Sequence, residues 1–208
     1  MPQISNNIQF QIFGSIAEKL DRTSESNPIF QGLFINFAFR GATHSFKVSK
    51  ELFESAPREN EEVWIFGDLS ANSTKLKFDA RRFEPVSERY PAPNILEENQ
   101  GLGALFMGPG TVEKSNWERG GDIRYRLQIQ SRGFNFMIAT SEELYYNIAD
   151  NTPYWLTGRV KVDSSFESAG GRRMWQNRYT LILDKFHDLA TLLKAERPRR
   201  PVPEKQEA

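Results

Sequence analysis

The sequence predicts an all-β protein with two domains in tandem. Gly and Pro residues separate short apolar stretches, and several of these stretches alternate with a period of two. The order of the stretches in the first half recurs in the second. A chain of 208 residues has room for two small domains. We expect domains at residues 1–86 and 105–193, a linker over 87–104, and a disordered tail over 194–208 that is rich in Pro and charge.

The two halves contain the same elements in the same order. The matching pairs are Gly14 and Gly108 in the first strand, Leu33–Phe39 and Ile123–Ile129 as the second, Phe46 and Phe136 in the third, Lys50–Phe53 and Glu142–Tyr145 as a short helix, Trp64 and Trp155 in the fourth strand, and Phe83 and Phe186 in the fifth. Gly67 and Gly158 follow the two tryptophans at the same spacing. A glycine inside a strand destabilises it unless the backbone bends or another group approaches closely.

Five short strands with a helix between the third and the fourth is the arrangement of the OB fold, a partly open Greek-key barrel. The first strand of such a barrel needs a glycine or a bulge to bend through both sheets, and Gly14 and Gly108 are placed for it. We therefore predict two tandem OB-fold five-stranded Greek-key barrels, each with a short helix between strands 3 and 4. A helical turn is expected at His187–Leu193.

The second half resembles the bacterial single-stranded DNA-binding protein family in its tandem OB-fold version. The resemblance rests on the pattern of Tyr154–Val160, on Gly170, Gly171 and Trp175 in a long hairpin, and on Arg178–Leu183 opening a strand. It implies single-stranded DNA binding, as in DNA replication or repair, and a homodimer in which two chains supply four barrels. The chain departs from the family at Phe134, which replaces a tryptophan, and at Trp175, which lies late in its loop. The family's acidic, hydrophobic C-terminal tip is absent, so the resemblance does not imply partner recruitment by that route.

Composition restricts the possible partners. The formal net charge is zero, which weighs against a duplex binder whose affinity depends on cationic contacts to phosphate. The aromatic content of 12% allows binding of single strands by base stacking, although small barrels also need aromatic residues in their cores. The absence of cysteine excludes disulfides, Cys-ligated zinc and thiol nucleophiles. No signal peptide and no apolar run of about 20 residues is apparent, so we expect a soluble cytoplasmic protein without membrane contact.

Strand alternation and the long hairpin Val162–Arg178 supply the candidate binding residues. The outward face of the second strand is polar and basic, and Trp155 lies beside basic residues on the fourth, as a stacking platform requires. The nucleic-acid-binding candidates are Trp117, Arg124, Arg126, Arg132, Phe134, Trp155, Arg159, Lys161, Phe166, Arg172, Arg173, Trp175 and Arg178. A secondary set in the first half is Arg40, Lys47, Lys75 and Lys77. An ordinary solvated face for the second strand, and an interface role for Trp155, remain open, and for Trp64 the interface is favoured.

The sequence offers no support for catalysis. Its two histidines, His44 and His187, are far apart, and it contains no P-loop, dinucleotide fingerprint or nucleophile elbow. We predict a non-catalytic single-stranded DNA-binding protein with no cofactor, no metal and no small-molecule substrate. The alternatives are an OB-fold protein-interaction or assembly module, since fold does not dictate function, and single-stranded RNA binding, since no feature identifies a 2′-hydroxyl.

Overall fold

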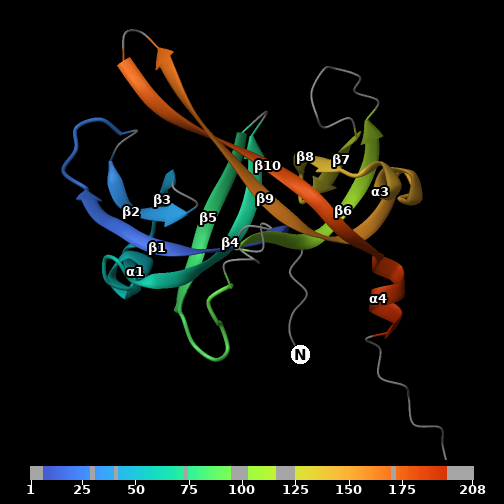
Figure 1. Cartoon of the computed structure of the whole chain (residues 1–208), viewed down its shortest axis with the longest axis horizontal. Helices are drawn as coiled ribbons and strands as arrows, with labels where there is room; N and C mark the ends of the chain where they lie inside the picture. Colours follow the sequence, from blue (N-terminus) through green and yellow to red (C-terminus); the bar gives the residue numbers. More distant parts are fainter. Residues whose placement is uncertain are drawn as a thin grey trace, which may run out of the picture.

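A computed structural model describes residues 7–28, 31–39, 42–72, 75–94, 103–115, 125–169 and 172–195, with side chains except at 42, 72, 75, 115, 164–169, 172–177 and 193–195. This part of the chain is all-β, with three short helices (Figure 1). The elements are β1 (Gln9–Arg22), β2 (Gly32–Phe39), β3 (Ala42–Val48), α1 (Lys50–Ser55), β4 (Glu62–Asn72), β5 (Lys75–Pro85), β6 (Ala104–Ser115), β7 (Tyr125–Ser131), β8 (Phe134–Thr140), α3 (Glu142–Asn147), β9 (Thr152–Ala169), β10 (Arg172–Asp188) and α4 (Leu189–Ala195).

The second half forms a closed five-stranded barrel. β6 pairs with β7, β7 with β8, and β9 with both β10 and β6, all antiparallel. A short parallel pairing of β10 with β8, at Leu181 opposite Ile138, closes the ring. α3 lies between β8 and β9, and the Ser141 side chain caps it by accepting from the Leu144 N–H at 3.3 Å. This strand order is that of the OB fold.

The first half has the same antiparallel pairings but does not close. Its strands follow the order β3-β2-β1-β4-β5, with α1 between β3 and β4. β3 and β5 contact each other, yet no ladder joins them in the described part of the chain. The structure therefore contains one closed barrel, in the second half, and the predicted second barrel is not confirmed.

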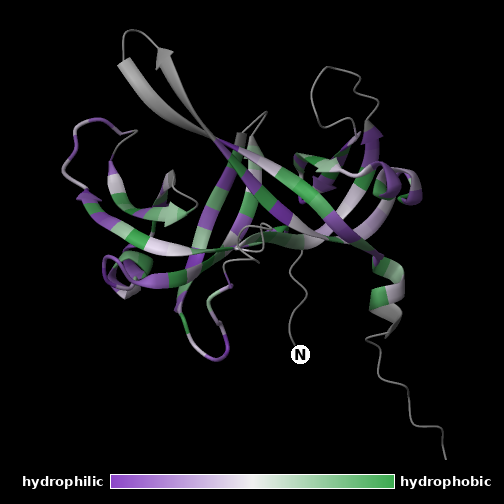
Figure 2. Ribbon diagram, in the orientation of Figure 1, coloured by the Kyte–Doolittle hydropathy of each residue, from purple (hydrophilic) through white to green (hydrophobic). Residues whose placement is uncertain are grey.

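The two halves share one sheet and one core. Residues 9–12 of β1 pair antiparallel with residues 104–107 of β6, with Phe10 opposite Phe106. A single cluster of buried apolar side chains extends from β1–β5 into β6–β10. Apolar and polar residues alternate along the strands, as expected of strands with one face in the core (Figure 2).

Gly67 and Gly158 are explained by the close approach of a phenylalanine ring. A Cβ at Gly67 would lie 2.6 Å from the Phe10 ring, and one at Gly158 would lie 2.6 Å from the Phe106 ring. Each would also lie within 2.2 Å of a backbone carbonyl of the neighbouring strand. The mid-strand glycines therefore make room for the paired phenylalanines of β1 and β6.

In the first three strands, the residues that correspond between the two halves differ by two positions from the predicted correspondence. Gly14 lies opposite Val63, the residue before Trp64, and Gly110 lies opposite Tyr154, the residue before Trp155. Gly110, rather than Gly108, is therefore the counterpart of Gly14. A shift of two residues keeps the inward and outward faces unchanged, so alternation alone does not detect it.

A tyrosine of β10 lies against the open edge of the first half. The Tyr179 ring is 4.6 Å from the Phe78 ring of β5 and 5.5 Å from the His44 ring of β3. His44 is 6% exposed, and its Nε2 faces the Phe39 carbonyl at 3.4 Å. Since a carbonyl only accepts, Nε2 carries the proton and Nδ1 accepts from the Tyr179 hydroxyl at 2.5 Å. Burial lowers the pKa of His44 below its ordinary value, so the ring is neutral.

The segments predicted as linker and tail are partly ordered. The Trp64 indole N–H donates to the Pro91 carbonyl at 3.0 Å, so residues of the expected linker cover this side chain, which is 9% exposed. Trp64 is therefore buried within its own chain. α4 includes residues 194 and 195 of the expected tail, and residues 196–208 lie outside the described part. No described helix has the length and apolar character required to cross a membrane.

Gly158→Ala is expected to lower the free energy of unfolding by at least about 2 kcal/mol, because its Cβ would lie 2.0 Å from the Ile182 carbonyl oxygen. Strand propensity predicts the opposite sign, since alanine normally loses less backbone entropy than glycine. Urea denaturation measures the change. The control is Gly133→Asn, in an open turn with φ +78°, for which a loss under about 1 kcal/mol is expected. Equal losses in the two variants would contradict the packing explanation.

The stability of the protein should fall between pH 7.5 and pH 5.5 through His44. Its folded pKa is lower than its unfolded value of about 6.5, so its contribution is complete above pH 6.5 and is lost on acidification. Urea midpoints at the two pH values test this in wild type and His44→Asn, and the variant should change less. His187→Asn, which replaces an exposed histidine, should behave as wild type. An unchanged pH response in His44→Asn would contradict the assignment.

Candidate nucleic-acid interface

The outward face of β7 and β8 forms a wall that contains no carboxylate. Leu127 and Ile129 are fully buried, whereas Arg126 and Gln130 on the opposite side of β7 are exposed. On β8 the side chain of Met137 is 44% exposed. Neither strand contains Asp or Glu, so Arg126 has no acidic neighbour on these two strands. We call this surface the β7–β8 wall.

The turn at the end of the wall displays two of the predicted residues. Arg132 and Gly133 connect β7 to β8, with φ values of +47° and +78°. Positive φ at both central residues is the geometry of a tight type I′ hairpin turn. Arg132 is exposed, and Phe134 is 39% exposed while its ring packs edge-on against Phe136. A cation and an aromatic ring are therefore both exposed at this end, with Phe134 on the Phe136 side of β8 rather than on the Met137 side.

A cavity of about 180 Å³ opens at the other end of the wall, where β10 pairs with β8. Its lining residues are Arg126, Met137, Ile138, Ala139, Tyr179 and Thr180. The Arg126 guanidinium provides hydrogen-bond donors only, whereas the Thr180 hydroxyl donates and accepts. The Met137 thioether and the Tyr179 ring provide polarizable apolar surface. The cavity is suited to a planar group with acceptors on its edge.

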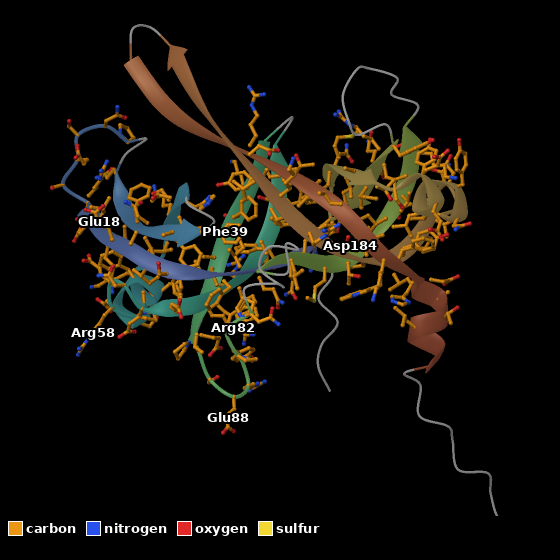
Figure 3. All side chains as sticks on the ribbon, in the orientation of Figure 1. Glu18, Phe39, Arg58, Arg82, Glu88 and Asp184 are labelled. Atoms are coloured by element: carbon orange, nitrogen blue, oxygen red, sulfur yellow. The ribbon has the colours of Figure 1, made fainter. Side chains whose placement is uncertain are left out.

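The basic residues predicted on β9 are paired with carboxylates. The Arg159 guanidinium contacts both oxygens of Asp184 on β10, with Nε 3.0 Å from each and Nη2 2.9 Å from Oδ1. Asp184 is labelled in Figure 3. The Lys161 ammonium lies 3.1 Å from Asp163. The side chains of these pairs are a third to a half exposed, where an ion pair contributes only about 0–1 kcal/mol. Their charges nevertheless offset each other, so β9 presents less free positive charge than predicted.

Trp155 lies on a different surface from Arg126. It is half-buried on the outer side of β9, opposite Pro109 of β6 and His187 of β10. In the closed barrel β6 alone lies between β9 and β7, but Trp155 is opposite Pro109 of β6 whereas Arg126 is opposite Ser115, six residues further along β6. The predicted site therefore separates into the β7–β8 wall and an outer sheet face that continues through β6 to β1.

Several predicted residues lie outside the described part of the structure. Trp117, Arg124 and Arg40 are among the residues not described, and the side chains of Phe166, Arg172, Arg173, Trp175 and Lys75 are likewise not described. The backbones on both sides of the hairpin belong to β9 and β10. Arg178 is exposed at the base of this hairpin, opposite Asp163. In the first half Lys77 is exposed, and the Lys47 ammonium lies 6.0 Å from the Phe34 ring centroid.

The α3 end of the barrel is acidic. Its first turn contains Glu142 and Glu143, and a hydrogen bond to Glu142 raises the pKa of Tyr125 to about 12. Tyr146 is 67% exposed beside Tyr125, at a centroid distance of 5.9 Å. The carboxylates make this aromatic surface less suited to phosphate than the β7–β8 wall.

Of the six residues that line the cavity, only Arg126 is among the predicted site residues. Met137 lies between the buried Phe136 and Ile138, so strand alternation predicts that its side chain points outward. Tyr179 and Thr180 belong to the motif that supports the family resemblance, but that motif does not reveal the parallel pairing of β10 with β8. Among the described residues, no group of three or more His, Asp or Glu side chains could hold a metal ion.

Two solved structures have this fold over nearly the whole chain. A deletion mutant of the single-stranded DNA binding protein from Thermus aquaticus aligns with a TM-score of 0.51 and 12% identity, covering 96% of this chain and 98% of that one. The wild-type Thermus protein aligns with a TM-score of 0.50 and 11% identity, covering 94% and 95%. At these identities the similarity concerns the fold. No protein-family profile and no curated protein matches the sequence.

Proposed function

We propose that the chain binds single-stranded DNA without catalysing a reaction. The β7–β8 wall supports this most directly, because it combines Arg126, the exposed Met137 and a cavity for a planar group without any carboxylate on the two strands. Proteins that bind single strands without sequence preference combine a positive groove with side chains on which bases stack. The Thermus proteins of the same fold bind single-stranded DNA according to their names, which adds to the proposal.

The β9–β10 hairpin is proposed to extend the groove. Loops between strands 1–2 and 4–5 line the binding cleft of OB folds, and these correspond to residues 116–124 and to this hairpin. Arg178 stands exposed at its base. In this proposal Arg172 and Arg173 contact phosphates, while Phe166, Trp175 and Trp117 stack on bases. Arg124 and Arg132 add positive charge, and Phe134 adds an exposed ring. The first-half cations Arg40, Lys47, Lys75 and Lys77 are proposed as a secondary set that contributes less.

A homodimer is proposed through the outer sheet face. Leu105, Met107 and Pro109 of β6 are half-buried, and the register places Pro109 opposite Trp155, Met107 opposite Thr157 and Leu105 opposite Arg159 of β9. Apolar residues with an aromatic anchor are typical of interfaces between subunits. The same surface supports the second candidate function, an assembly module. Arg159 and Lys161, with their carboxylate partners, would then belong to the rim of the interface rather than to the groove.

Arg126→Met should weaken binding of a fluorescent oligo-dT of about 35 nucleotides roughly tenfold, because it removes a charge-assisted contact. The slope of log affinity against log salt should change by less than the about 0.7 that loss of one phosphate contact would cause, because Arg126 lines the cavity for a planar group. Fluorescence anisotropy titration measures both quantities. Arg159→Met is the matched control and should change affinity less than about threefold, because Asp184 already holds that guanidinium.

No binding of oligo-dT at low salt by folded wild-type protein would refute the DNA-binding proposal and favour the assembly module. Equal losses for Arg126→Met and Arg159→Met would move the site away from the β7–β8 wall. An oligo-rU titration separates DNA from RNA, and tighter binding of the RNA would change the class of ligand.

Trp155→Arg should convert the proposed dimer to a monomer, because a buried charge without a partner destabilises an interface. Sedimentation velocity measures the mass in solution, with Arg126→Met as a control that stays dimeric. A monomeric wild type, or a Trp155→Arg protein that is still dimeric, would contradict this interface.

A further inference from the structure

The cavity at the end of the β7–β8 wall is the size of one small planar group. Its volume of about 180 Å³ is below the roughly 300–1,000 Å³ of pockets that hold drug-sized ligands. Its lining residues include Met137 and Tyr179, whose side chains can stack on a planar group, and Arg126 and Thr180, whose side chains can hydrogen-bond its edge. A nucleobase has both a face for stacking and an edge that carries acceptors.

The Tyr179 side of this cavity is held from the first half of the chain. The Tyr179 hydroxyl donates to Nδ1 of His44 on β3, and the tyrosine ring packs 4.6 Å from the ring of Phe78 on β5. His44 is itself fixed, since it is buried and its Nε2 faces the Phe39 carbonyl (labelled in Figure 3). With these two neighbours the Tyr179 ring has few alternative positions, so the cavity keeps its shape before a ligand arrives.

We propose that this cavity holds one unstacked base of the bound strand, and that His44 positions Tyr179 as its wall. The inference rests on the proposed function and adds a role for the first half. Arg126 hydrogen-bonds an acceptor on the base edge, the base stacks between Tyr179 and Met137, and His44 acts through Tyr179 without touching the ligand. The first half thereby contributes to binding as a support for the second.

Oligo-dT of about 35 nucleotides is the probe, because thymine carries carbonyl acceptors on its edge. Affinity is measured by fluorescence anisotropy at pH 7.5 with variants that circular dichroism shows to be folded. Tyr179→Ala should lower affinity about tenfold or more, through loss of the stacking surface. Tyr179→Phe and His44→Phe should each lower it about three- to tenfold, through loss of the hydrogen bond that orients the wall. The double variant should lose no more than either single one, because both remove the same contact.

A rescue variant separates a positioning role of His44 from a role in the general stability of the protein. The Oδ1 atom of asparagine can accept in place of Nδ1, so His44→Asn should restore most of the affinity that His44→Phe loses. Ile35→Val is the matched control, because it reduces packing in the fully buried first-half core and should leave affinity unchanged. A loss in Ile35→Val equal to that in His44→Phe, or no recovery in His44→Asn, would overturn the positioning role.

The failure of this inference differs from the failure of the proposed function. If wild-type protein does not bind the oligonucleotide, the proposed function fails. If wild type binds and Arg126→Met weakens binding, but the Tyr179 and His44 variants bind as wild type, the function stands and the base cavity with its positioned wall is refuted.

Discussion

The pairing of β1 with β6 is the interaction on which the rest of the structure depends. Phe10 and Phe106 lie opposite each other across this pairing, and each ring occupies space that a side chain at Gly67 or Gly158 would fill. The two phenylalanines and two glycines thus connect four strands from both halves. Because both rings belong to one buried cluster, the two halves share a core.

The two halves differ in whether their edge strands pair with each other. In the second half β10 pairs with β8 and closes a barrel, whereas in the first half β3 and β5 contact each other without a ladder. Tyr179 contacts Phe78 and His44 at this open edge. A strand edge with unpaired backbone groups is available to other partners unless it is covered. Tyr179, a side chain of the second half, therefore covers part of the open edge of the first half.

For the choice of a binding surface, the distribution of charge over the molecule matters more than the net charge of zero. On β9 the cations are paired with Asp163 and Asp184, and α3 begins with two glutamates. The β7–β8 wall contains no acidic residue of its own, so Arg126 and Arg132 meet no carboxylate within these two strands, and the exposed Glu113 of β6 lies opposite Gln128 at its border. A neutral chain can in this way present one surface suited to a polyanion, since interactions between exposed charges are screened over about 8 Å in physiological salt.

Three local features of the sequence predict the all-β class, most strand positions and the outward direction of Arg126. They are the alternation with a period of two, the repeated Trp-x-x-Gly pattern, and the Gly and Pro residues between the strands. These are local properties, because each depends on residues within one strand. Tertiary structure alone decided that Gly110 matches Gly14, because a two-residue shift leaves every side chain on the same face. It also decided that Asp184 neutralises Arg159, that Pro91 covers Trp64, and that Tyr179 meets His44. Each of these contacts joins different strands or segments, and pattern along one strand carries no information about its neighbours.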